Sequence, residues 1–189
     1  HEHCPEVHRW KLEKILKNKS LIILFIIFSI SSLIAQKKEF RELENNPFSV
    51  GERLTFDVKY GFVTAGVAVM EIPSIKKIAK RDVYHVRFNV NSVESFDSFF
   101  KVRDRYETYL DVKGLFPWRF EQHIREGNFS RDFSAFFDQR KNSAKTSKGT
   151  YEIPDYVNDI VSAFYLARTF DFKSLKEGES FHLENFFKD

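Results

Sequence analysis

Residues 53–72 read RLTFDVKYGFVTAGVAVMEI, and this stretch decides the fold. From Leu54 to Tyr60 every second residue is large and apolar, and the residues between them are polar or charged. A period of two places the apolar side chains on one face of a β-strand whose other face is solvated. The segment from Gly61 to Gly66 interrupts the pattern, which resumes from Val67 to Ile72. Two strands joined by a glycine-flanked turn predict a β-hairpin.

The same alternation returns several times after this hairpin. Turn residues separate the runs, for example at Gly114–Pro117 and Gly127–Asn128. Further predicted strands lie at 84–91, 102–111, 118–125, 129–138, 143–146 and 150–153. Short strands broken by regular turns predict an antiparallel meander, which forms either a curved sheet or a barrel-like domain.

One segment departs from the strand pattern. After Pro154, Asp155 is a candidate cap for a helix over 156–170, where apolar residues follow a period of 3.6. A final strand is expected over 180–187, and the sequence ends inside it. The predicted fold is therefore mainly β, with one helix at about 155–170 packed on the sheet.

The beginning of the chain has the parts of a secretory signal peptide. Four lysines between positions 11 and 19 precede an apolar run from Leu21 to Ile34, which ends at Ala35. The run is shorter than the roughly 20 apolar residues that span a bilayer. We predict cleavage after Ala35, a linker over 36–47 and a single β-rich domain over 48–189 that continues beyond the given sequence. An uncleaved signal anchor that tethers the protein to the membrane is the alternative.

Charge and cysteine content indicate the compartment and exclude one class of partner. Of 30 basic residues five precede Gln36, and of 27 acidic residues three do, so the remaining chain is nearly neutral. It lacks the basic excess typical of nucleic-acid binding. The sole cysteine, Cys4, precedes the apolar run, so an exported domain would contain no disulfide. This favours a Gram-negative periplasm over a disulfide-rich secreted product, with membrane contact only through the signal peptide.

The sequence predicts no catalytic residue, no metal site and no cofactor. After the predicted signal peptide the histidines are isolated at 85, 123 and 182, whereas a metal site needs three or four converging ligands. Ser98 and Lys101 match the spacing of a serine acyl-transferase motif, but they fall between two predicted strands and not on a helix. An enzyme is therefore the least favoured class.

Apolar residues on the predicted strands supply candidates for a binding surface. Of 22 phenylalanines, 20 follow Gln36. One explanation is a large core or an apolar cavity, and the alternative is the codon bias of an AT-rich genome. Asp104 shares a strand face with Val102 and Tyr106 and is a candidate buried polar residue whose partner would come from another strand. The candidate ligand-lining residues are Phe56, Val58, Phe88, Phe120, Phe133 and Phe137.

Three segments carry a family resemblance: FSVGERLTFDVKYGFVTAGVAV at 48–69, FPWRF at 116–120 and DIVSAFYLAR at 159–168. They resemble a bacterial exported family known as domain of unknown function 3108, over roughly residues 48–189. The resemblance implies an envelope protein built mainly of antiparallel strands, with a further C-terminal portion. It implies no activity and no site residues.

Two functional hypotheses follow for an exported envelope protein. The first is non-catalytic binding of a hydrophobic or glycan ligand by the aromatic face of the sheet. The second is a structural or protein-interaction role without a small-molecule ligand, acting through the surface or a sheet edge.

Overall fold

The computed structural model describes residues 39–44 and 47–187. The predicted signal peptide, its cleavage site after Ala35 and the alternative signal anchor lie outside these residues. The chain from Phe40 onward forms one compact unit. Among the described residues, no helix combines the length and the apolar character needed to cross a membrane.

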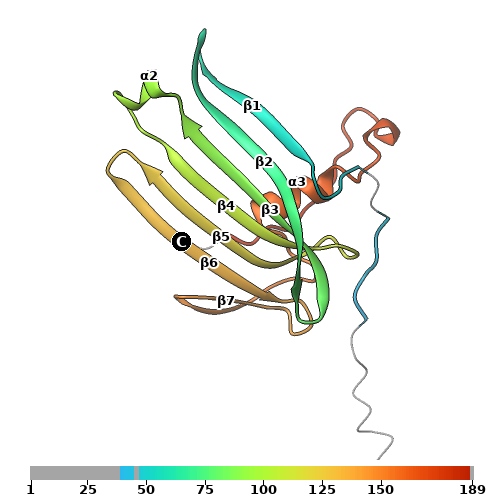
Figure 1. Cartoon of the computed structure of the whole chain (residues 1–189). Helices are drawn as coiled ribbons and strands as arrows, with labels where there is room; N and C mark the ends of the chain where they lie inside the picture. Colours follow the sequence, from blue (N-terminus) through green and yellow to red (C-terminus); the bar gives the residue numbers. More distant parts are fainter. Residues whose placement is uncertain (1–38, 45–46, 188–189) are drawn as a thin grey trace, which may run out of the picture. The chain divides into compact units, whose positions relative to one another are not determined.

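Eight strands pair in sequence order as one antiparallel meander (Figure 1). The sheet is curved, and β1 does not pair with β8, so the barrel-like alternative is wrong and the curved sheet is confirmed. The strands are β1 (Arg53–Tyr60), β2 (Val63–Ile78), β3 (Arg81–Ser92), β4 (Arg103–Asp111), β5 (Pro117–Glu126), β6 (Phe129–Asp138), β7 (Ser143–Thr146) and β8 (Gly149–Glu152). The helical segments are α2 (Glu94–Asp97), α3 (Ile160–Ala167) and the 3₁₀ turn η1 (Phe172–Ser174).

The opening hairpin forms as its sequence predicts. Phe56 of β1 pairs with Ala68 of β2, and the turn uses Gly61 at φ +59°, a conformation that glycine adopts without strain. Gly66 has a different role, because a Cβ there would lie only 2.6 Å from the carbonyl oxygen of Asn91 in β3. The absence of a side chain therefore allows β2 and β3 to approach at this point.

The predicted helix exists, but it begins later than expected. Its N-cap is Asp159 and not Asp155: the Asp159 carboxylate accepts hydrogen bonds from the backbone N–H groups of Val161 and Ser162 at 2.8 and 2.9 Å. Tyr156 has a φ of +56°, which is incompatible with a helix at that position. The expected final strand over 180–187 is also wrong, since only an isolated bridge between Asn158 and Asn185 forms there.

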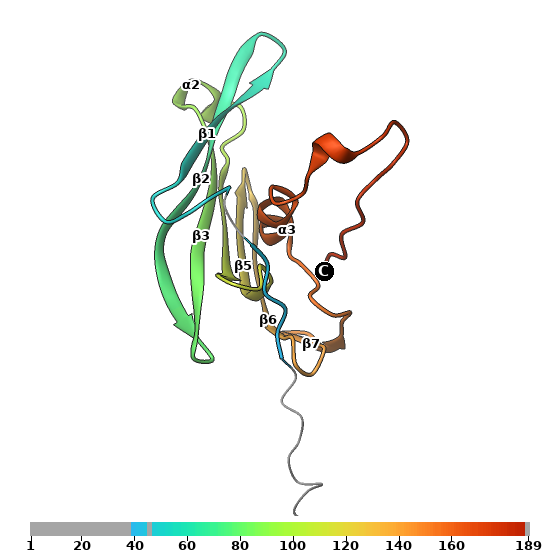
Figure 2. The same cartoon turned by 90° about the vertical axis from the view of Figure 1, so that its right-hand side faces the viewer.

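Helix α3 covers part of one face of the sheet, which we call the inner face (Figure 2). Val161, Tyr165 and Leu166 of the helix join strand residues in the main core. The opposite, outer face carries cross-strand ion pairs: Glu71 of β2 lies between Arg53 of β1 and Arg87 of β3. The sheet thus has one apolar side and one charged side, as the alternation predicts.

Two contacts fix α3 on the inner face. The Thr108 hydroxyl of β4 donates a hydrogen bond of 2.6 Å to the Asp159 carboxylate, which is almost fully buried. Burial raises the pKa of Asp159, and the hydrogen bonds from Thr108 and from the start of the helix oppose that rise. At the other end of the helix, the Arg168 guanidinium binds both oxygens of Glu52 at 2.6 and 2.8 Å. The helix is therefore held at both ends.

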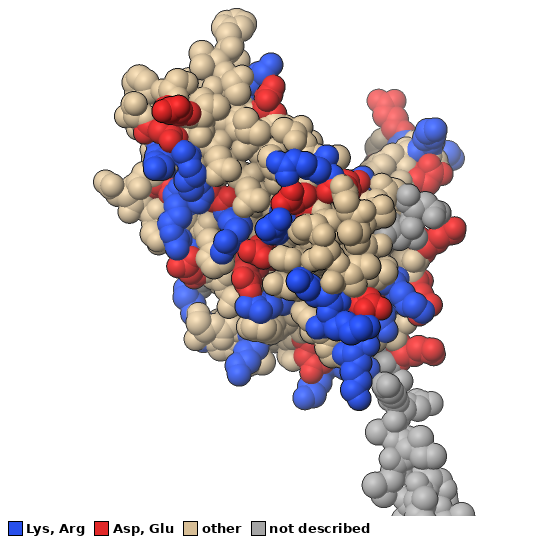
Figure 3. Space-filling model, viewed as in Figure 1, with Lys and Arg blue, Asp and Glu red and all other residues tan. Residues whose placement is uncertain are grey.

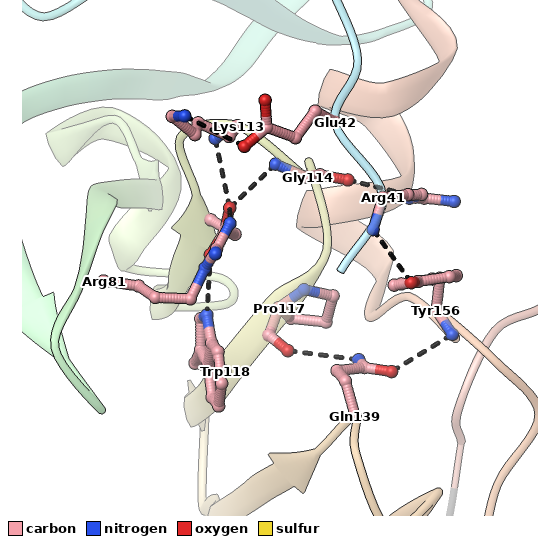
Figure 4. A network of polar contacts seen from close by, with 10 residues as sticks. Arg41, Glu42, Arg81, Lys113, Gly114, Pro117, Trp118, Gln139 and Tyr156 are labelled. Carbon is pink, nitrogen blue, oxygen red and sulfur yellow. Dashed lines mark hydrogen bonds and ion pairs between the residues drawn. The ribbon is translucent and has the colours of Figure 1, made fainter. Parts of the chain in front are cut away.

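A second buried carboxylate, that of Asp111, lies at the end of the sheet where the turn between β4 and β5 is found (Figure 4). Asp111 accepts hydrogen bonds from Arg81 at 2.5 and 2.8 Å, from Trp118 Nε1 at 3.0 Å and from the Gly114 N–H at 2.7 Å. Burial acts to raise the pKa of Asp111, but these donors outweigh it and the pKa lies below its ordinary value. Phe40 packs on Trp118, so the segment before β1 is fixed to the same cluster.

We expect Asp111→Asn to reduce the free energy of unfolding by about 3 kcal/mol at neutral pH, because it leaves Arg81 without its carboxylate. Urea unfolding monitored by circular dichroism measures this loss. Since the folded pKa of Asp111 is lowered, its contribution is complete above pH 3.8 and is lost as the pH falls through the folded value. The difference in unfolding free energy between wild type and variant should therefore shrink in acid.

The matched control is Asp82→Asn. Asp82 is an exposed partner of Lys77, and this substitution should change stability by less than about 1 kcal/mol. An equal effect of both substitutions would contradict the role given to Asp111.

We expect Thr108→Val to lower the free energy of unfolding by about 2 kcal/mol, since it removes a donor to the buried Asp159 carboxylate. Thr108→Ser is the matched control: it keeps the hydroxyl and should recover most of the stability. Urea titrations of the two variants decide the point. A loss in Thr108→Ser as large as that in Thr108→Val would contradict the weight given to the hydrogen bond, since serine keeps the hydroxyl donor.

Candidate ligand-binding groove

An open groove of about 490 Å³ lies between the inner face of the sheet and helix α3. This volume falls within the range of about 300–1,000 Å³ that is typical of small-molecule sites. Its lining is mostly apolar and comes from six strands, β1 to β6, from the helix and from the end of the described chain. The lining residues are Phe56, Ala68, Met70, Phe88, Tyr106, Phe120, Gln122, Arg131, Phe133, Ile160, Val161, Phe164, Phe186 and Phe187.

One cross-strand row forms the floor of the groove. Direct register partners run across β2 to β6 in the order Met70, Phe88, Tyr106, Gln122 and Phe133. Side chains in register on the same face of a sheet lie next to each other. The floor is therefore continuous.

Helix α3 and the end of the described chain form the wall. Ile160 is 69% exposed although it lies on the helix beside the inner face, and Phe164 and Phe187 are also exposed. Large apolar side chains that gather around one concave surface indicate a binding site, whereas scattered ones do not. Because α3 is fixed by Asp159 and Arg168, the wall is in place before any ligand binds.

A small polar region lies within the groove and next to it. Tyr106, Gln122 and Arg131 contribute the polar lining, and burial raises the pKa of the Tyr106 hydroxyl. Asp104 is 5% exposed and accepts a hydrogen bond of 2.8 Å from the backbone N–H of Arg125 in β5. Burial and the neighbouring Asp104 carboxylate raise the pKa of Glu126. Asp104 is thus buried, and its partner comes from the adjacent strand.

The structure brings four of the six candidate lining residues together. Phe56, Phe88, Phe120 and Phe133 all line the groove. Val58 lies instead in a second, smaller pocket of about 100 Å³. Phe137 is buried in the core and packs edge-on against Phe186, so it does not reach the groove.

Sequence reasoning missed the helical wall. Ile160 and Phe164 belong to the predicted helix, but their orientation toward the groove depends on the anchoring of α3. Met70 follows the same alternation as Phe56 and could have been found from the strand pattern. Phe186 and Phe187 belong to the segment that was expected to be a strand.

The histidines lie outside the groove. His85 contacts Glu107 at 2.5 Å and stacks on Tyr109, and His123 contacts Asp132 at 2.7 Å. Both belong to the charged pairs of the outer face, and His182 pairs with Glu184 at the surface. Over residues 39–44 and 47–187, no three metal-ligating side chains converge on one point.

Comparisons with curated proteins and with solved structures gave no match. A family model described as a protein of unknown function (DUF3108) matches residues 55–189. The matched region begins inside β1 and includes every residue that lines the groove. It covers most of the chain and confirms the resemblance seen in the sequence, so the chain belongs to the DUF3108 family.

Proposed function

We propose that this protein is a non-catalytic binder of an apolar, chain-like molecule, such as a fatty acyl chain of an envelope lipid. One observation carries the proposal: the groove is open, apolar and held in shape by contacts that involve no ligand. Burying an acyl chain there would contribute about 0.8 kcal/mol for each CH₂ group removed from water.

The lining favours a lipid over a glycan. A glycan needs many hydrogen-bonding partners around its hydroxyl groups, whereas the groove offers mainly aromatic and aliphatic side chains. Its polar groups, Tyr106, Gln122 and Arg131, come from three adjacent strands, β4 to β6, and suit the polar end of an amphiphile. No catalytic step is part of the proposal.

The proposal places the protein in the bacterial envelope. The predicted signal peptide, which with upstream residues makes up 1–35, supports export, and the given sequence after Ala35 contains no cysteine. A periplasmic location would bring the groove close to membrane lipids. A chain tethered by an uncleaved signal anchor would have the same access.

The proposal is tested by native mass spectrometry of the mature chain from Gln36, isolated gently from its own envelope fraction. Extra mass that organic extraction identifies as a lipid would support the proposal. A glycan would contradict the lipid assignment. A ligand-free mass, together with no uptake of the fluorescent fatty acid cis-parinaric acid, would favour the structural or protein-interaction role.

We expect Ala68→Phe to weaken binding of cis-parinaric acid at least about tenfold, because the added ring occupies the groove floor. Val69→Phe is the matched control, since the next residue along β2 points to the outer face. It should bind the fatty acid as the wild type does. Fluorescence titration measures both affinities, and circular dichroism verifies the fold.

A second substitution keeps this test decisive if Ala68→Phe does not fold. Ile160→Glu introduces a charge at an exposed position of the helical wall, where it should disturb the fold little. We expect the same loss of fatty-acid affinity. Unchanged binding by this variant would contradict the groove as the site.

A further inference from the structure

Three connections meet at one end of the sheet. Because the strands form a meander, three connections lie at the same end of the sheet (Figure 1): the β1–β2 turn, the β3–β4 connection with α2, and the β5–β6 turn. They carry five exposed aromatic side chains, which we call the aromatic end: Tyr60, Phe62, Phe99, Phe100 and Phe129. Phe62 is fully exposed and Phe99 is 84% exposed. Large aromatic side chains that gather at one solvent-exposed place indicate an interaction surface.

Backbone contacts hold the aromatic end together. The N–H of Val93 donates to the carbonyl oxygen of Ala65 at 3.0 Å, which joins the β3–β4 connection to β2. The N–H of Gly127 donates to the carbonyl oxygen of Lys101 at 2.8 Å, which joins it to the β5–β6 turn. The β3–β4 connection is therefore joined to β2 and to the β5–β6 turn, and the aromatic groups lie at one end of the sheet.

Gly127 also brings Phe100 close to the β5–β6 turn. A Cβ at this glycine would lie 3.1 Å from the Phe100 ring, and its φ of +55° suits glycine. An ion pair of 2.5 Å between Asp97 and Arg103 fixes the base of the same connection. The aromatic rings therefore project from a rigid support.

The charged residues nearest these rings are the exposed lysines Lys59 and Lys101, which suit an anionic surface. Asp57 and Glu126 lie one residue outside the segments 58–65 and 127–130 that carry the rings. Of the two carboxylates in α2, Asp97 is neutralised by Arg103 and Glu94 stays exposed. Figure 3 shows mainly uncharged surface at the upper end of the molecule, with a few acidic and basic side chains among it.

We propose that the aromatic end docks on the surface of a lipid bilayer that contains anionic lipid. Aromatic rings with nearby lysines suit the bilayer interface, where the rings enter the acyl boundary and the ammonium groups stay with the phosphates. The rings project from three separate connections and not from one flat strand face, which suits a deformable lipid surface.

A small pocket of about 100 Å³ lies between the aromatic end and the groove. Its lining includes Val58, Val90, Val102 and Phe100 as well as Asn91 and Ser92, and Val58 lies two residues from Phe56 of the groove on the same strand. The bilayer is thus the source from which the groove would take its ligand, a step that rests on the function proposed above. Docking itself depends only on the aromatic end.

Flotation of the mature chain from Gln36 with phosphatidylcholine vesicles, with and without phosphatidylglycerol, tests docking. We expect binding to increase with phosphatidylglycerol, and Phe62→Ser together with Phe99→Ser to lower vesicle partitioning about tenfold or more. The matched control is Phe136→Ser together with Phe172→Ser, which also removes two exposed phenylalanines but not at the aromatic end. This control should float as the wild type does.

Two further readouts separate docking from the proposed function. The aromatic-end double variant should still bind cis-parinaric acid in solution, whereas Ala68→Phe should still float with vesicles. Equal flotation of the wild type and the aromatic-end variant would overturn docking, and so would no flotation of the wild type. Stable binding of a protein partner at this end, without flotation, would also overturn docking on a bilayer. Fatty-acid binding would then test the function of the groove separately.

Discussion

The hydrogen bond between the Thr108 hydroxyl and the buried Asp159 carboxylate determines what the inner face can do. It joins the middle of β4 to Asp159, the N-cap of α3, 51 positions later in the chain. A buried carboxylate without partners would be costly, so the helix start has one stable position on the sheet. The bidentate contact between Arg168 and Glu52 then fixes the direction of the helix. The position of the groove follows from these two contacts.

A helix fixed in this way leaves part of the inner face open. α3 is only eight residues long and the sheet has eight strands, so the helix is too short to cover the whole inner face. Beyond the helix, the cross-strand row from Met70 to Phe133 stays accessible on the inner face. Closing the sheet into a barrel would have buried this row. Because the sheet stays open, the row becomes the floor of a groove.

The sequence was sufficient to predict the features that depend on local patterns. It was insufficient for those that depend on contacts between residues far apart in the chain. Strand alternation predicted the meander, and it also identified Phe56, Phe88, Phe120 and Phe133 as residues of one face. Asp155 and Asp159 are both candidate caps by residue type. Asp159 is the cap because Ser162 and Thr108 bind it, and no pattern near the helix reveals the contact with Thr108. Phe133 and Phe137 share one alternation, but the distant Phe186 covers only Phe137. Lining and core were therefore indistinguishable without the tertiary contacts.

The distribution of apolar surface connects the groove to the aromatic end. On the outer face, charged side chains pair across the strands, as Arg53 does with Glu71. The exposed apolar surface is concentrated on the inner face and at the aromatic end. Moving an acyl chain through water between a bilayer and a distant groove would cost about 0.8 kcal/mol of free energy for each exposed CH₂ group. A carrier avoids this barrier when its binding surface reaches the bilayer without a polar gap. Val58, Val90 and Val102 line the small pocket beside the aromatic end, so the proposed lipid binding and the proposed docking would use neighbouring surfaces of the molecule.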